Sequence, residues 1–67
     1  MNNFSNNLKY YREKASLTLK ALAEQLGVGT TTVHDWETKR SEPNIEMLIN
    51  IADLFGITVD ELVRDIK

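Results

Sequence analysis

The chain contains no cysteine and only one histidine, His34, among its 67 residues. It therefore has no disulfide framework, and no cluster of metal ligands can form around His34. No run of 18 apolar residues and no basic-then-apolar leader is present, so we expect no membrane span and a reducing, cytoplasmic setting. Glycine is scarce and forms no phosphate-binding loop. These absences predict a protein without metal, cofactor or enzymatic activity.

The composition fits one small globular domain spanning residues 1–67. Apolar residues make up 42% of the chain, enough for a core and too many for a disordered segment. A chain of this size buries only about 60% of the surface that its unfolded form exposes. Every element must therefore share the same core.

The charges are distributed unevenly along the chain, although the net charge is only −2. Residues 1–40 carry six basic and four acidic groups, a net charge of +2. Residues 41–67 carry two basic and six acidic groups, a net charge of −4. Such asymmetry is expected when one face meets nucleic acid and another does not, but a mixed, solvated surface gives the same counts.

Five helical segments and no strand are predicted, at about 5–15, 19–26, 30–38 and 45–55, with a fifth that opens at 58–61. Ser5, Thr18 and Asn44 are the expected N-caps, and the fifth segment opens with a capping box. Gly56 ends the fourth helix, while Pro43 keeps the preceding loop from being helical.

Two of these segments carry informative apolar patterns. In the first, the stripe expected to be buried consists of Phe4, Leu8, Tyr11 and Ala15. In the fourth, residues 45–55 are apolar around most of the helix. That breadth predicts a central, mostly buried helix.

The most informative stretch is 18–37, which predicts two helices joined by a tight turn at Gly27. The first has an apolar stripe, and the second has only two large apolar residues, Val33 and Trp36, at i and i+3. Trp36 is therefore interpreted as a core anchor. The residues left facing outward are Thr30, Thr31, Thr32, His34 and Asp35. A helix pair with this turn is the architecture that inserts its second helix into the DNA major groove.

The chain resembles the Cro and phage-repressor type of helix-turn-helix proteins, the XRE-like bacterial and phage regulators. The resemblance covers about residues 8–62. Its motif words are LxxYREK at 8–14, LAExLGV at 22–28, TVxxWE at 32–37, EP at 42–43, LxxIAxxFGI at 48–57 and DEL at 60–62. Each word is common, but their order and spacing together are specific.

The resemblance implies an all-α, five-helix domain of the lambda-repressor-like type, which binds double-stranded operator DNA, usually as a homodimer. Such a regulator most often represses through an inverted-repeat operator. By position, the residues facing base edges are Thr30, Thr31, Thr32 and Asp35. Those expected at phosphates are Thr18, Lys20, His34, Thr38, Lys39, Arg40, Ser41 and Asn44. Arg12 and Glu37 match a buried ion pair of the family.

Several assignments have alternatives. The threonine hydroxyls could only cap the second helix of the motif, Asp35 could accept from cytosine N4 or face water, and His34 could make no contact. Lys39 and Arg40 could be solvated loop charges. The expected dimer contacts, some of which could instead complete the core, are Ile57, Val59, Val63 and Ile66.

The chain departs from the family pattern where threonines occupy the usual Arg, Gln or Ser positions of the second helix of the motif, and at three further positions. Leu19 replaces a common Gln and is expected to lean on the edge of the core. Ser16 and Lys39 each stand where relatives place Gly, so a left-handed backbone at either position would be mildly strained. These departures concern affinity and operator sequence, not the fold. The alternative function is a protein-interaction module of the same fold, an antitoxin or anti-repressor whose acidic C-terminal helices hold a protein partner.

Overall fold

The computed structural model describes residues 3–64, and these form five helices and no strand. The helices are α1 (Phe4–Lys14), α2 (Leu19–Leu26), α3 (Thr30–Glu37), α4 (Ile45–Phe55) and α5 (Val59–Val63). The all-α, five-helix prediction is confirmed, and most boundaries agree within one residue. Within the described residues, no helix is long and apolar enough to cross a membrane.

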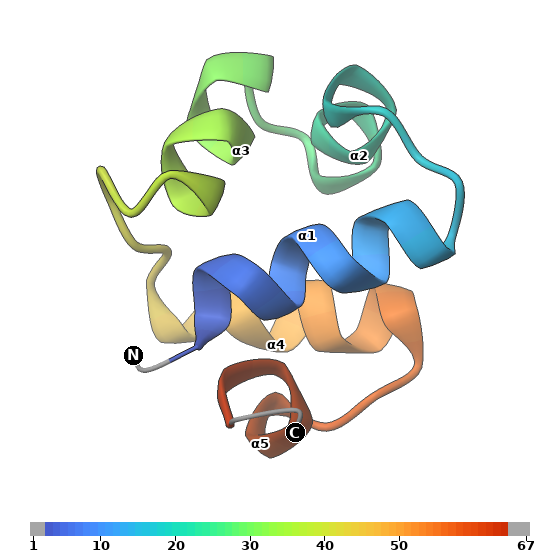
Figure 1. Cartoon of the computed structure of the whole chain (residues 1–67), viewed down its shortest axis with the longest axis vertical. Coiled ribbons are helices and arrows are strands. Elements are labelled where there is room, and N and C mark those ends of the chain that lie inside the picture. Colours follow the sequence, from blue (N-terminus) through green and yellow to red (C-terminus); the bar gives the residue numbers. More distant parts are fainter. Residues whose placement is uncertain (1–2, 65–67) are drawn as a thin grey trace.

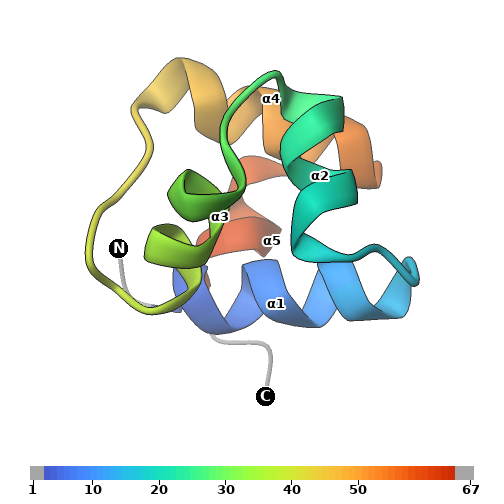
Figure 2. The same cartoon turned by 90° about the horizontal axis from the view of Figure 1, so that it is seen from above.

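Helices α2 and α3 lie together at one end of the molecule, above α1 in the view of Figure 1. Helix α1 crosses the middle, and α5 lies at the opposite end. Seen from the α2–α3 end, α1 and α4 occupy opposite edges (Figure 2). The helix-turn-helix thus forms one end of the domain, and its α3 lies on α1.

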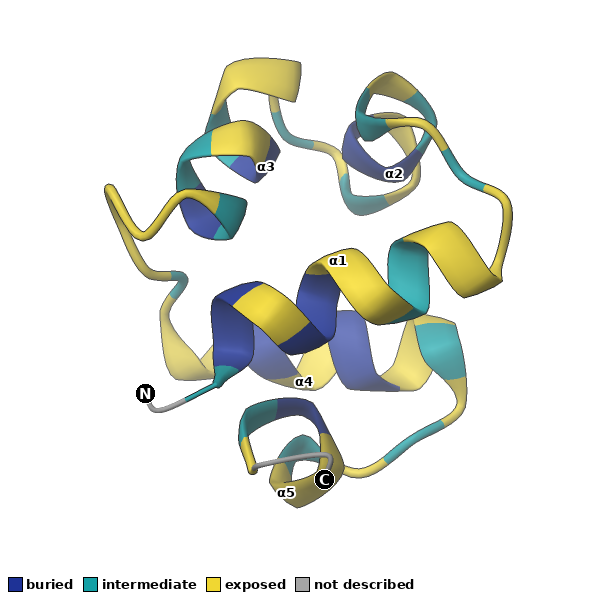
Figure 3. Ribbon diagram, viewed as in Figure 1, coloured by how far each residue is buried: buried dark blue, intermediate teal, exposed yellow. Residues whose placement is uncertain are grey.

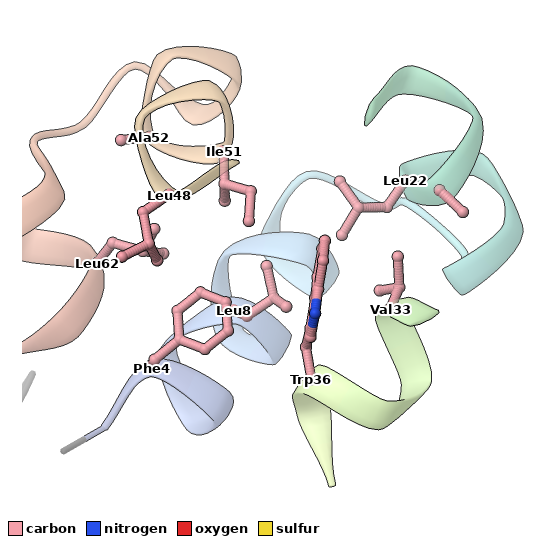
Figure 4. Close-up of a cluster of buried hydrophobic side chains, with 10 residues drawn as sticks. Phe4, Leu8, Leu22, Val33, Trp36, Leu48, Ile51, Ala52 and Leu62 are labelled. Carbon is pink, nitrogen blue, oxygen red and sulfur yellow. The ribbon is translucent and has the colours of Figure 1, made fainter. Parts of the chain in front are cut away.

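The core draws side chains from all five helices, which point toward one centre (Figure 4). Its buried hydrophobic residues are Phe4, Leu8, Leu22, Ala23, Val33, Trp36, Leu48, Ile51, Ala52 and Leu62. Each fully buried Leu or Ile side chain contributes roughly 1.5–3 kcal/mol relative to exposure. Val33 and Trp36, the only large apolar residues of α3, are 0% and 4% exposed, so α3 is anchored by one face alone.

The helices begin and end largely where the sequence predicts, at N-cap hydrogen bonds and at glycines. Thr18 Oγ1 accepts from the Ala21 N–H at 3.0 Å, and Asn44 Oδ1 accepts from the Met47 N–H at 2.8 Å. Thr58 opens α5 with the expected capping box. Gly27 (φ 73°) and Gly56 (φ 70°) stop α2 and α4 in the left-handed region, where a side chain would be strained.

The predicted start and buried stripe of α1 are partly wrong. The helix begins at Phe4, one residue earlier than expected, so Ser5 lies inside the first turn and does not cap it. Ser5 is buried, and its hydroxyl donates to the Trp36 carbonyl at 2.5 Å. Ala15 follows the last helical turn and is exposed. The hydroxyl of Ser5 thus ties α1 to the last turn of α3.

Asn7 is a buried polar residue that the sequence pattern does not single out. It is 2% exposed, and its Nδ2 donates to the carbonyls of Leu62 at 2.9 Å and Arg64 at 2.5 Å. These carbonyls belong to the C-terminal end of α5, where no helical partner remains. Asn7 therefore fastens α5 to α1.

The prediction that α4 is mostly buried is wrong. Leu48, Ile51 and Ala52 face the core, whereas Ile45 is 74% exposed and Ile49 is 45% exposed. The reason is size, because the other helices of such a short chain cover only one face of α4. An apolar stripe on the outer side of α4 is left in solvent.

Candidate nucleic-acid interface

The first turn of α3 presents short polar side chains to solvent. Thr30 and Thr31 are exposed and Thr32 is half-buried, while Val33 and Trp36 turn into the core. In Figure 3 this first turn forms part of an exposed surface at the α2–α3 end. The spacing of the two anchors thus fixes which side chains of α3 face outward.

The hydroxyls of these threonines are available for an external partner. Gly29 is the N-cap residue of α3 and makes no side-chain cap. Among residues 3–64, the hydroxyls of Thr30, Thr31 and Thr32 make no hydrogen bond. The structure therefore does not use them as caps. A free Thr hydroxyl can donate to or accept from a base edge, and its methyl can meet a thymine methyl.

Asp35 lies one turn along α3 from Thr31 and is half-buried, with a side chain that is 31% exposed. Its nearest cationic neighbour is His34, whose Nδ1 lies 4.0 Å from Asp35 Oδ1 and is charged only when protonated. His34 itself is exposed. The Asp35 carboxylate keeps acceptor capacity, which cytosine N4 could use.

The loop after α3 places two cations next to this helix. The backbone N–H groups of Arg40 and Ser41 donate to the Asp35 carbonyl at 2.9 and 3.4 Å, which folds the loop against the end of α3. Lys39, Arg40 and Ser41 are exposed. Within the described residues no carboxylate pairs with either cation. Lys39 adopts φ 66°, which lies in the left-handed region.

Strain at Lys39 is informative because left-handed backbone costs a non-glycine residue of order 1 kcal/mol. Ser16 shares this geometry, with φ 59°, at the end of α1. Lys39 and Ser16 thus carry the same kind of backbone strain, with a similar free-energy cost. Only Lys39 lies beside α3 and adds a positive charge there.

The remaining predicted phosphate contacts differ in what they can still donate. Thr18 uses its oxygen to cap α2 and keeps its hydroxyl proton, and Asn44 uses Oδ1 to cap α4 and keeps its amide N–H groups. Lys20 is exposed in the first turn of α2. Thr38 instead donates its hydroxyl to the His34 carbonyl at 3.0 Å, which leaves it less suited to a phosphate.

Arg12 and Glu37 form the buried ion pair that the resemblance implies. Arg12 Nε lies 2.7 Å from Glu37 Oε2 and Nη2 lies 3.2 Å from Oε1, while Nη1 donates to the Leu17 carbonyl at 2.8 Å. The side chains are only 11% and 8% exposed. The hydrogen bond to Glu37 raises the pKa of Arg12, outweighing the opposing effect of burial. This pair locks the end of α3 onto α1.

The residues expected at a dimer contact are half-buried. Ile57, Val59 and Val63 pack against the core and keep part of their surface in solvent. Ile66 lies outside the described residues. Among the described residues, the most exposed large hydrophobic side chain is instead that of Ile45, on α4.

Comparison with known proteins places this geometry in a family. The model described as Helix-turn-helix matches residues 8–62. The chain belongs to the XRE-type helix-turn-helix family. This helix-turn-helix chain is 40% identical, over 60 residues, to the HTH-type transcriptional activator BcrR of Enterococcus faecalis. The match covers 90% of the chain but 29% of BcrR, so the chain spans less than a third of that relative.

Solved structures of helix-turn-helix proteins share the fold. A transcriptional regulator from Listeria innocua superposes with a TM-score of 0.86 at 34% identity, covering 96% of this chain and 60% of that one. The P22 c2 repressor, solved with a synthetic operator, gives a TM-score of 0.84 at 24% identity, covering 91% and 92%. The latter likeness shows the fold alone. The matched relatives are named as transcriptional regulators.

Proposed function

We propose that the chain binds an inverted-repeat operator as a homodimer, with α3 in the major groove, and represses transcription by occluding a promoter. It would act in the cytoplasm, on the nucleoid or on phage DNA. One observation carries this proposal: the start of α3 exposes threonine hydroxyls, and the loop folded against the end of α3 exposes two cations that pair with no carboxylate among residues 3–64. The first can read bases and the second can hold phosphates.

Base readout would rest on Thr30, Thr31, Thr32 and Asp35. None of these can make the bidentate contact to guanine that Arg makes, so each provides modest discrimination. A single half-site would therefore be read weakly. Two half-sites about one helical turn apart multiply the discrimination, which favours a dimer.

For the dimer we propose the partly exposed sides of Ile57, Val59 and Val63, together with Ile66. In the sequence these residues lie around the junction of the fourth and fifth helices and near the C-terminal end. The half-burial of Ile57, Val59 and Val63 supports this assignment, since an apolar side chain with a free face can still add contact area. Sedimentation at DNA-binding concentrations measures the state directly.

Phosphate and base contacts can be separated by variants of α3 and its loop. Arg40→Ala should weaken binding to a random duplex and to a selected operator alike, by roughly tenfold, and lower the log–log salt slope by about one per subunit. Thr31→Ala should weaken only the selected operator, by roughly three- to tenfold. Fluorescence anisotropy between 50 and 200 mM salt measures both the affinities and the salt slope. With about three or four phosphate contacts, we expect a log–log slope of roughly −3 to −4 per subunit for the parent chain.

The control is Lys9→Ala, which removes an exposed α1 cation that we assign to solvent. It should change neither affinity nor slope. If the double variant Thr31→Ala with Arg40→Ala binds DNA as the parent does and melts normally, α3 and its loop are not the DNA-binding surface.

The two left-handed residues offer a matched pair. Lys39→Gly and Ser16→Gly should each stabilise the fold by roughly 0.5–1 kcal/mol, because each relieves the same backbone strain. Only Lys39→Gly should also weaken DNA binding, by several-fold, since it removes a phosphate-facing charge. Urea unfolding and anisotropy on the same samples compare the two effects. Equal DNA affinity for both variants would mean that Lys39 is a solvated loop charge.

A further inference from the structure

The outer side of α4 carries an apolar stripe that the fold leaves uncovered. Ile45 is 74% exposed and Ile49 is 45% exposed, and they are four residues apart, so they lie next to each other on the helix surface. Asp53 continues the same row by a further four residues and is exposed. Adjacent exposed aliphatic side chains form a contiguous apolar surface of the kind that a binding partner can cover.

Acidic side chains border this stripe, and the surrounding sequence contains no basic residue. Residues 41–63 contain five acidic residues and no Lys, Arg or His. Two of the five acidic side chains already have partners in or next to α5. Asp60 Oδ2 pairs with Arg64 Nη2 at 2.7 Å, and Glu61 completes the capping box. Glu46 and Asp53 are exposed on α4, and within residues 3–64 neither forms an ion pair.

Seen down the helix axis, Glu46 and Asp53 lie on the same side of Ile49. With about 100° between successive residues, Glu46 stands about 60° round the helix from Ile49 and Asp53 about 40° round it in the same direction. The outer side of α4 therefore has an apolar centre and an acidic border along one edge. We call this surface, made of Ile45, Glu46, Ile49 and Asp53, the α4 face.

We propose that the α4 face is a docking surface for a basic amphipathic helix of a partner protein. The apolar stripe of such a helix would cover Ile45 and Ile49, and its flanking Lys or Arg side chains would reach Glu46 and Asp53. Charge complementarity of this kind steers association and selects the partner. The stripe is short, which fits a transient contact and not an obligate interface.

A second copy of the chain is a poorer occupant. A two-fold contact uses the same patch on both subunits, so it would bring the acidic border of one copy toward that of the other. Such juxtaposed like charges disfavour association. DNA is excluded by the same charge. Helix α4 lies at the edge of the domain opposite α1 (Figure 2), whereas Thr30 and Thr31 belong to the α2–α3 end, so DNA and a protein partner could be held at once.

The test uses a synthetic 18-residue peptide with a leucine stripe at helical spacing and Lys or Arg on both flanks. The matched peptide carries Glu in place of each Lys and Arg. Anisotropy of the labelled peptides with the whole chain should show binding of the basic peptide alone, weakening as salt rises. Ile49→Ser should weaken binding by roughly tenfold or more, and the pair Glu46→Gln with Asp53→Asn by a similar factor and with a flatter salt dependence.

The matched control is Leu54→Ser. Leu54 is on the same helix and is similarly exposed, at 37%, but it lies about 140° round the helix from Ile49. Leu54→Ser should change peptide affinity less than twofold. Both Leu54→Ser and Ile49→Ser should keep parental DNA affinity, and all variants should keep the parental circular dichroism. This docking proposal does not depend on DNA binding, so a chain that binds no DNA can still bind the basic peptide.

Four results would overturn it. These are equal binding of the acidic peptide, no binding of the basic peptide at millimolar concentration, equal effects of Ile49→Ser and Leu54→Ser, and dimerisation of the chain without peptide that Ile49→Ser abolishes. The last result would assign the α4 face to a second copy.

Discussion

Replacing Arg12 by Ala is expected to destabilise the domain by roughly 3–5 kcal/mol, because it leaves the Glu37 carboxylate buried without a partner. Glu37 is only 8% exposed, so water cannot take over the hydrogen bonds that Arg12 provides. The carbonyl of Leu17 loses its donor as well. Urea unfolding followed by circular dichroism measures the loss.

The chain offers a matched control for this ion pair. Arg64 and Asp60 also form a short pair, at 2.7 Å, but both side chains are 64% exposed. Arg64→Ala should therefore cost less than about 1 kcal/mol. Adding Glu37→Gln to Arg12→Ala should recover part of the loss, since the buried charge is then removed. A change below about 1 kcal/mol for Arg12→Ala would mean that Glu37 is solvated in solution.

Trp36→Ala is the second variant with a large expected effect. Trp36 is 4% exposed, meets Phe4 edge-on with ring centroids 6.5 Å apart, and is one of two apolar anchors of α3. Removing it should cost roughly 3–5 kcal/mol. A domain of this size has only about 3–10 kcal/mol of stability, so the variant should be largely unfolded at 37 °C or close to it.

Circular dichroism at 222 nm is the suitable measurement, because the chain has no other tryptophan to report by fluorescence. Trp36→Phe is the conservative control and should lose less, since much of the apolar contact is kept. If Trp36→Ala melted like the parent while losing DNA affinity, Trp36 would be a base-stacking residue and not a core anchor.

Features set by neighbouring residues were predictable from the sequence. The capping residues Thr18, Asn44 and Thr58 and the glycine stops act within one helical turn, and the structure contains all of them. The question of left-handed backbone at Ser16 and Lys39 could also be raised from the sequence, because side chains stand there in place of a family glycine, and both residues adopt it. The outward side of α3 followed from the spacing of its two anchors.

Features set by distant segments were not predictable. Ser5 and Asn7 look like ordinary polar residues of a helix, and only the docking of α3 and α5 on α1 turns them into buried donors. Which side of α4 stays uncovered depends on which other helices reach it. Because α4 is apolar around most of its circumference, its sequence pattern does not indicate which side is buried. The available signal was chain length, since 67 residues cannot surround a helix of 11.

The most direct test of operator binding is selection from a random duplex DNA library at physiological salt, followed by sequencing. We expect an enriched inverted repeat whose half-sites lie about one helical turn apart, with Thr31→Ala changing the preferred bases within each half-site. No enrichment by a chain that is folded by circular dichroism would contradict sequence-specific binding through α3.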